Sequence, residues 1–404
     1  MNVPRMLSRA LLAAALAQTA QATETFVYFG SHSSAPGAGF SLARFDSDTG
    51  ALSRPEFLLE AKEPAFFVIS ADGTHLYTCN SGTPGGLSAY SVEPHTGRLR
   101  LLNRVLAGGG DTSFISLDRA GRHVLAANYD GGSVAVFALR PDGSIGDWTA
   151  FDQHSGRSVN PVRQTHAYAH AIVLDPANRF ALVPDLGTDR LYIYRYDEAT
   201  GGLEPNVPAY VPIAPGSGPR HVRFHPNGRW VYLINEIAST IVAFNWDPVS
   251  GALAPFQTVS TLPSDFKGVS TCAELEIHPN GKFLYGSNRG HDSLAVFGID
   301  QVTGKLSPVE FHPSGGKTPR NFALDPTARW LVLTNQDSGN AVVFRVHPNT
   351  GRLTETGDPV PVPSPFCERF LPAQKPPFVF DPDPKFGNRQ IRGSNSLPLT
   401  CTPN

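Results

Sequence analysis

The 404-residue chain is predicted to be all-β, a seven-bladed β-propeller with four antiparallel strands per blade. A short glycine turn recurs seven times along the sequence, and a longer hairpin segment recurs six times. Both recur at intervals close to the roughly 40–50 residues that form one propeller blade. This period indicates one repeat architecture rather than two or three unrelated domains.

In the glycine turn, a small or polar residue precedes the glycine and an apolar residue follows two positions after it. Successive copies are 46 to 58 residues apart. Each turn is expected to join the third strand of a blade to a weaker fourth strand. The glycines are Gly50, Gly97, Gly143, Gly201, Gly251, Gly304 and Gly351.

The hairpin segment has an apolar or alternating run, a turn of Gly, Asn, Asp or Pro, and a β-branched and aromatic run closed by Asn or Asp. This pattern is typical of two antiparallel strands. All six copies have the same length, which argues against a two-sheet sandwich or two smaller β domains. They span residues 66–80, 114–128, 171–185, 221–235, 274–288 and 321–335.

Seven turns but six hairpins mean that the two ends of the chain have to supply the last hairpin. We expect residues 25–30 to form an inner strand and residues 366–371 to pair with it. Closing the ring in this way protects the strand edges that an open array would expose. The propeller is therefore predicted to span residues 23–371.

The N-terminus has the three parts of a secretory signal peptide. Arg5 and Arg9 supply positive charge, residues 10–17 form a short apolar run, and an A-x-A cleavage site ends at Ala22. The apolar run is too short to span a bilayer. We predict that residues 1–22 are removed from a periplasmic or secreted protein, the alternative being a short amphipathic or transit-type helix.

Residues 372–404 are Pro-rich, lack the blade pattern and are predicted to form a C-terminal extension. Since an exported protein can form disulfides, Cys367 and Cys401 are the one pair that we expect to be linked. Cys79 lies in an apolar strand and is expected to be an inert core thiol. No cysteine pair has the spacing of zinc ligands, and no H-x-H or E-x-x-H arrangement with a well-placed carboxylate stands out. The sequence therefore predicts no catalytic metal and no cofactor.

The formal net charge is −2, and charges of both signs are balanced. This balance removes the electrostatic reason to expect that the protein binds nucleic acid, or that it binds a membrane through a polybasic segment. No GxSxG motif is present, which argues against an ordinary serine esterase. The sequence leaves the oligomeric state open.

Charged residues occupy two repeat positions that hairpin geometry places at the same edge of a blade. Just before the hairpin, most blades have a small or neutral residue, whereas three have His170, Arg220 or Arg320. Just after the closing Asn or Asp, Glu236 and Arg289 stand out. We expect all five side chains to meet at one mouth of the central channel.

Such a group suits acyl transfer or proton transfer on an anionic substrate. Guanidinium groups bind carboxylates or phosphates and stabilise a developing oxyanion, while a Glu or His can deprotonate water. The alternative is an ion-pair cluster that fills the channel without catalysing anything. The excess of Arg over Glu favours an anion-binding site.

Further residues are expected to contact substrate near this mouth. Tyr129 and Gln336 occupy the second repeat position in their own blades, and His221 and His291 lie beside two of the charged residues.

Several segments together resemble the seven-bladed β-propeller lactonase family, which includes bacterial 6-phosphogluconolactonase and fungal 3-carboxy-cis,cis-muconate lactonizing enzyme. The most specific motif is GPRH-x-x-FHP followed by NE, and the resemblance extends over about residues 26–371. The segments are residues 28–33, 170–197, 216–236, 287–297 and 318–326.

The resemblance implies lactone hydrolysis or the reverse ring closure. The family's proposed site is a His, two Arg and a Glu, which fall by motif on His170, Arg220, Arg289 and Glu236. In that mechanism Glu236 or His170 would activate water and Arg220 would hold the carbonyl oxygen. Arg289 would hold an anionic group of the substrate together with Arg320.

At one position the chain departs from the family. The family often has the motif PHAH there, whereas residues 167–170 of this chain are AYAH. Tyr168 is therefore expected to contact substrate in place of a histidine. We expect a small anionic lactone, such as that of a sugar acid, met outside the cytoplasm. The alternatives are a non-enzymatic propeller that binds a small anion or a protein partner, and muconate-lactonizing (isomerase or lyase) chemistry.

Overall fold

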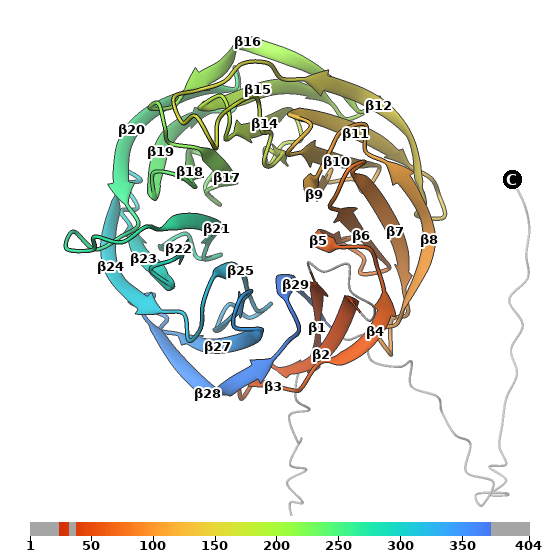
Figure 1. The fold of residues 1–404 in the computed structure, drawn as a ribbon, viewed down its shortest axis with the longest axis vertical. Coiled ribbons are helices and arrows are strands. Elements are labelled where there is room, and N and C mark those ends of the chain that lie inside the picture. The colour runs from red at the N-terminus through yellow and green to blue at the C-terminus, as the bar shows by residue number, and fades with distance from the viewer. Residues whose placement is uncertain (1–23, 32–37, 373–404) are drawn as a thin grey trace, which may run out of the picture. The chain divides into compact units, whose positions relative to one another are not determined.

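The computed structural model describes residues 24–31 and 38–372, so the predicted signal peptide and all but the first residue of the predicted extension lie outside the described residues. Seven antiparallel sheets stand around a common axis, as Figure 1 shows. The prediction of a seven-bladed, all-β propeller with four antiparallel strands per blade is confirmed. Over the described ranges there is no helix, and hence none long and apolar enough to cross a membrane.

The first three blades, each given from its inner to its outer strand, are as follows. They comprise β29 (Pro365–Pro372), β1 (Glu24–Ser31), β2 (Gly39–Asp46) and β3 (Ala51–Leu52), with β4 (Glu56–Glu60) also paired to β2; β5 (Pro64–Ile69), β6 (His75–Asn80), β7 (Gly86–Val92) and β8 (Leu99–Leu106); β9 (Thr112–Leu117), β10 (His123–Asn128), β11 (Ser133–Leu139) and β12 (Ile145–Gln153).

The other four blades follow in the same order. They comprise β13 (Val173–Leu174), β14 (Phe180–Asp185), β15 (Arg190–Asp197) and β16 (Gly202–Pro212); β17 (Pro219–Phe224), β18 (Trp230–Asn235), β19 (Thr240–Asp247) and β20 (Ala252–Ser260); β21 (Thr271–Ile277), β22 (Phe283–Arg289), β23 (Ser293–Ile299) and β24 (Leu306–Pro313); β25 (Pro319–Leu324), β26 (Trp330–Asn335), β27 (Asn340–Val346) and β28 (Leu353–Pro361).

The core lies between the faces of neighbouring blades. Every residue of the second strands β10, β14, β18 and β26 is buried. Because both faces of these strands pack against another blade, their sequences are apolar runs rather than alternating ones. The outer strands, such as β8 and β28, are largely exposed.

The recurrent glycine turn is a contact between blades. Its seven glycines have φ between 70° and 81°, a left-handed conformation that favours glycine. A Cβ on Gly304 would lie 2.5 Å from the Trp230 ring of the preceding blade. The Tyr232 hydroxyl donates a hydrogen bond to the Gly304 carbonyl at 2.8 Å, and Tyr285 makes the equivalent bond to Gly351 at 3.0 Å.

The two ends of the chain close the ring, as expected, but in the opposite order. β29 is the innermost strand of its blade, and β1 lies between β29 and β2 as a second strand. The prediction that residues 25–30 form the inner strand was therefore wrong. The reason is burial: after Glu24 every residue of β1 is buried, as in the second strands of other blades.

Three cysteines are buried free thiols: Cys79, Cys272 and Cys367. Burial raises the pKa of the Cys367 thiol to about 12, and it also raises the pKa of Cys79, which agrees with an inert core residue. Cys367 lies in the inner strand β29. Its expected partner Cys401 lies outside the described residues.

Replacing Gly304 by Ala is expected to lower the free energy of unfolding by about 2–4 kcal/mol, because the new methyl group needs a left-handed backbone and meets the Trp230 ring. Gly228→Ala is the matched control, since Gly228 has φ 71° with nothing within 4 Å of its Cβ position. It should cost only about 1–2 kcal/mol. Urea denaturation measures both losses, and equal losses would contradict the proposed contact between blades.

Candidate active site

A β-bulge directs the side chain of Arg220 into the channel. In the hairpin of β17 and β18, Pro219 pairs with Asn235 and His221 pairs with Ile234, so Arg220 is an extra residue without a partner. The same irregularity occurs at Arg320, between Pro319 and Asn321 in β25. Bulges of this kind re-aim a side chain, which explains why this repeat position faces the channel.

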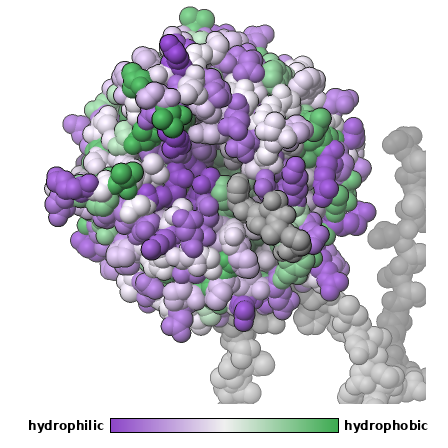
Figure 2. Space-filling view, viewed as in Figure 1, coloured by the Kyte–Doolittle hydropathy of each residue, from purple (hydrophilic) through white to green (hydrophobic). Residues whose placement is uncertain are grey.

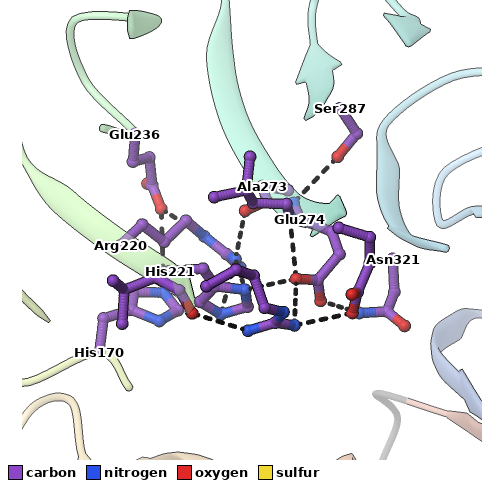
Figure 3. Close-up of polar contacts among 12 residues, drawn as sticks. His170, Arg220, His221, Glu236, Ala273, Glu274, Ser287 and Asn321 are labelled. Atoms are coloured by element: carbon purple, nitrogen blue, oxygen red, sulfur yellow. Dashed lines mark hydrogen bonds and ion pairs between the residues drawn. The ribbon is translucent and has the colours of Figure 1, made fainter. Parts of the chain in front are cut away.

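Glu236 is the centre of the charged group, and Figure 3 shows its contact with Arg220. It directly follows β18 and is buried, and its Oε2 accepts from Arg220 Nε at 2.9 Å. Arg289, the last residue of β22, places Nη2 3.1 Å from the same oxygen, and His170 Nε2 lies 3.9 Å away. His170, Arg220 and Arg289 thus gather around the carboxylate of Glu236, and these are four of the five predicted residues.

Charge in this cluster shifts the pKa of its members. Burial alone would raise the pKa of Glu236, but Arg289 and Arg220 hold that pKa well below its usual range. Burial and the nearby Arg289 lower the pKa of Arg220 to about 10, so this guanidinium still carries its charge at neutral pH. Glu236 is therefore an ionised carboxylate that neutralises buried arginines.

His170 is held in its neutral form. Burial, and then the charge of Arg220, lower the pKa of its imidazole well below the ordinary value of 6.5. Its Nδ1 is buried and has no hydrogen-bond partner. The ring packs edge-on against His221 and Tyr129, with ring centroids 5.2 and 5.3 Å away.

Arg320 has spare hydrogen-bonding capacity. Its guanidinium lies 3.6 Å from the centre of the Phe366 ring, and its Nη1 makes a long contact of 3.4 Å to Gln336 Oε1. Its Nε and that of Arg289 are buried without a partner. In the part of the chain that the structure describes, Arg320 makes no ion pair, so it can accept an anion without leaving a carboxylate unpaired.

The predicted neighbours divide into residues at the mouth and residues elsewhere. Tyr129 and Tyr168 pack against each other at 4.7 Å, and Tyr129 also contacts His170. His221 lies deeper, with Nδ1 2.9 Å from Glu274. His291 instead bonds to Ser293 at 2.7 Å and packs on Phe266, so the structure does not bring it into the charged cluster.

Sequence reasoning missed Arg163, which lies in the loop between β12 and β13. Its Nη2 donates to Glu236 Oε1 at 2.5 Å and lies 3.4 Å from the Tyr129 hydroxyl. Among the residues that the structure describes, no other blade has an equivalent of Arg163, so comparison of the repeats cannot find it. The available signal was the spacing of the glycine turns, because the 58-residue interval from Gly143 to Gly201 is the longest.

A second polar layer lies beneath the mouth and was also missed. Glu274 is fully buried and accepts from His221, from Arg223 at 2.9 Å and from Asn321 at 2.5 Å (Figure 3). Glu274 stands inside its hairpin rather than at the edge, where the sequence analysis looked. This layer fixes the orientation of His221, which in turn supports His170.

The pocket at the mouth is polar. Figure 2 shows hydrophilic residues gathered around the hollow at the centre of this face. Among residues 24–31 and 38–372, no group of three or more His, Cys, Asp or Glu could hold a metal ion. The residues that line the pocket are Phe66, Ser81, Asp111, Ser113, His170, Arg220, His221, Arg320, Asn321 and Phe366.

Comparison with known proteins decides the family. The family described as lactonase, 7-bladed β-propeller, matches residues 26–370. The chain belongs to this family. Membership confirms the predicted resemblance and makes the protein an enzyme of the lactone-hydrolase class, which removes the non-enzymatic alternative.

Named relatives agree with this assignment. The chain is 33% identical to 6-phosphogluconolactonase of Bacillus subtilis over 86% of its own length and 99% of the relative. It is 30% identical to 6-phosphogluconolactonase of Formosa agariphila over 79% and 91%. The solved structure of a periplasmic gluconolactonase from Pseudomonas aeruginosa is 31% identical and superposes with a TM-score of 0.82, covering 87% of this chain and 100% of that one.

Glu236→Gln is expected to destabilise the protein by about 3–5 kcal/mol at pH 7, because it leaves buried guanidiniums without a counter-charge. The pKa of Glu236 is lowered by folding, so its contribution is complete above the ordinary value of 4.5 and is lost as the pH falls toward the folded value. The difference in melting temperature between wild type and variant should therefore shrink below pH 4.5.

The matched control is Glu355→Gln, which removes an exposed carboxylate from the outer strand β28. It should change the melting temperature little at any pH. A difference for Glu236→Gln that stays constant down to pH 3 would contradict the lowered pKa.

Proposed function

We propose that this protein opens the lactone of an anionic sugar acid, or a related carboxylated lactone, by attack of water at the mouth of the propeller channel. The observation that carries the proposal is a neutral histidine with an unpaired nitrogen beside a surplus of guanidiniums. Four arginines surround Glu236 or lie near it, and His170 is 3.9 Å from the same carboxylate.

The reaction requires two things of the site. Water attacks the carbonyl carbon and loses a proton to a base, and the carbonyl oxygen becomes an oxyanion. Collapse of this tetrahedral intermediate breaks the ring C–O bond, and the ring oxygen takes a proton to give a hydroxy acid. The site must therefore accept a proton and stabilise negative charge.

His170 is the better base of the two candidates. Glu236 is ionised, but both of its oxygens already accept from guanidiniums, and its lowered pKa makes it a weak proton acceptor. His170 is neutral, lines the pocket and has a nitrogen without a partner. We assign proton acceptance to His170 and the positioning of the arginines to Glu236.

The arginines stabilise the developing and final negative charge. Arg220 lines the pocket with His170 and is fixed by Glu236, so it is placed to bind the oxyanion without reorganising. Arg320 and Arg289 have unpaired Nε groups for the product carboxylate or another anionic group. Preorganised donors of this kind are worth about 10²–10³ in kcat each.

The substrate class rests on two supports. The relatives are called 6-phosphogluconolactonase or periplasmic gluconolactonase, and their common chemistry is a lactone of gluconic acid. The sequence predicts export, which would separate the enzyme from cytosolic sugar phosphates. We therefore propose an aldonolactone or a carboxylated lactone outside the cytoplasm.

His170→Asn is expected to lower kcat for D-glucono-1,5-lactone by about 10²–10⁴, because general-base catalysis contributes that much. A pH-stat measures acid release, with the spontaneous rate subtracted. The control is His347→Asn, at an exposed turn far from the channel residues, which should leave kcat within about twofold of wild type. Retention of wild-type kcat by His170→Asn would overturn the assignment of the base. Failure of the wild type to open any lactone of a sugar-acid panel would overturn the function itself.

A further inference from the structure

Arg163 is unlike the other arginines of the cluster. Arg220 and Arg289 project from strands, and their side chains are 4% and 15% exposed. Arg163 projects from the loop between β12 and β13, and its side chain is 40% exposed. It is thus the guanidinium of this cluster that an incoming solute meets first.

Glu236 does not need Arg163 for neutralisation. Its Oε2 already has Arg220 and Arg289 within 3.1 Å, whereas Arg163 contacts only Oε1. If the Arg163 side chain moves away, the carboxylate stays paired with two buried guanidiniums. Releasing Arg163 takes one donor from the buried Oε1, and the new charge-assisted contact between Arg163 and a substrate anion offsets that loss.

The loop that carries Arg163 is firmly anchored. Gln164 is fully buried, and its Nε2 donates to the Leu186 carbonyl at 2.8 Å while its Oε1 accepts from the Asn160 amide at 3.1 Å. Ser158 donates to Asp189 at 2.6 Å. The backbone is thus fixed at the mouth, and only the long side chain of Arg163 has to move to change partner.

The cluster also carries a surplus of positive charge. Arg163, Arg220 and Arg289 share the single carboxylate of Glu236, and Arg320 makes no ion pair within the described residues. Asp111, the acid that lines the pocket, makes no ion pair there either. A bound anion would relieve this surplus.

We propose that Arg163 determines specificity: it rests on Glu236 in the free enzyme and transfers to a second anionic group of the substrate, a carboxylate or a phosphate outside the lactone ring. This inference rests on the proposed function. It assigns the enzyme a preference for lactones that carry such a group over uncharged lactones of the same ring.

The test compares substrates that differ in charge. D-glucono-1,5-lactone has no anionic group, D-glucaro-1,4-lactone carries a carboxylate, and 6-phosphoglucono-1,5-lactone carries a phosphate. Arg163→Gln should lower kcat/KM for at least one charged lactone by about tenfold, mainly through KM, because a charge-assisted contact is lost. It should leave the uncharged lactone within about twofold, and Arg163→Lys should restore part of the loss. Which of the two charged lactones is affected identifies the anionic group.

The matched control is Arg157→Gln, which removes an exposed arginine from the same loop. It should leave kcat/KM unchanged for all three lactones. Equal losses on charged and uncharged lactones would assign Arg163 a structural role and overturn the proposal. The proposal is also overturned if Arg163→Gln leaves the ratio of kcat/KM between charged and uncharged lactones unchanged. It is overturned as well if the wild type prefers neither charged lactone to the uncharged one.

Equilibrium binding separates this inference from the proposed function. By calorimetry, wild type should bind glucarate, with two carboxylates, at least tenfold more tightly than gluconate, with one, and Arg163→Gln should abolish the difference. If no lactone is opened but this difference holds, the hydrolytic function fails and the anion contact stands. If lactones are opened and glucarate binds no better than gluconate, the role of Arg163 is overturned alone.

Discussion

The pairing of β1 with β29 is the constraint on which the rest of the structure depends. Seven residue pairs along these strands, from Thr25 opposite Pro372 to Ser31 opposite Pro365, join the two ends of the described propeller. Each blade buries its second strand against a neighbour, so an open array would leave apolar faces and strand edges unprotected. The charged cluster depends on the same closure, because His170, Arg220 and Arg320 come from three different blades and meet only around a closed ring.

The centre of that ring holds buried charge that is satisfied in layers. Glu236 neutralises Arg220 and Arg289 at the mouth, and Glu274 binds Arg223 and His221 below it. A buried guanidinium without a counter-charge would be strongly destabilising. The carboxylates therefore allow these guanidiniums to be buried. The positive charge that they leave unneutralised at the mouth is available to bind an anionic substrate in the proposed reaction. Stability and the proposed anion binding would then be two consequences of one arrangement.

The repeat pattern predicted the architecture and most of the cluster because hairpin geometry fixes where equivalent residues lie. His170, Arg220, Glu236, Arg289 and Arg320 all occupy repeat positions, and the structure places them at one mouth. Arg163 escaped because its loop has no equivalent in other blades, and Glu274 because it lies inside a hairpin at a bulge. His291 was misplaced because closeness in sequence to Arg289 does not fix side-chain direction. The order of β29 and β1 depends on which strand is buried on both faces, which a single strand pattern does not reveal.

One electrostatic field performs two tasks in this site. Burial lowers the pKa of His170 well below 6.5, and the positive charge that would stabilise an oxyanion lowers this pKa further by opposing protonation of the imidazole. A histidine with an ordinary pKa would be largely protonated at pH 5.5 and unable to accept a proton from water. The lowered pKa keeps the imidazole of His170 neutral to a lower pH than that of an ordinary histidine, at the expense of intrinsic basicity, because a lower pKa makes a weaker base. In the proposed reaction, burial and the arginines thus exchange base strength for a base that stays unprotonated at lower pH, and the oxyanion stabilisation that the arginines would supply offsets the weaker proton transfer.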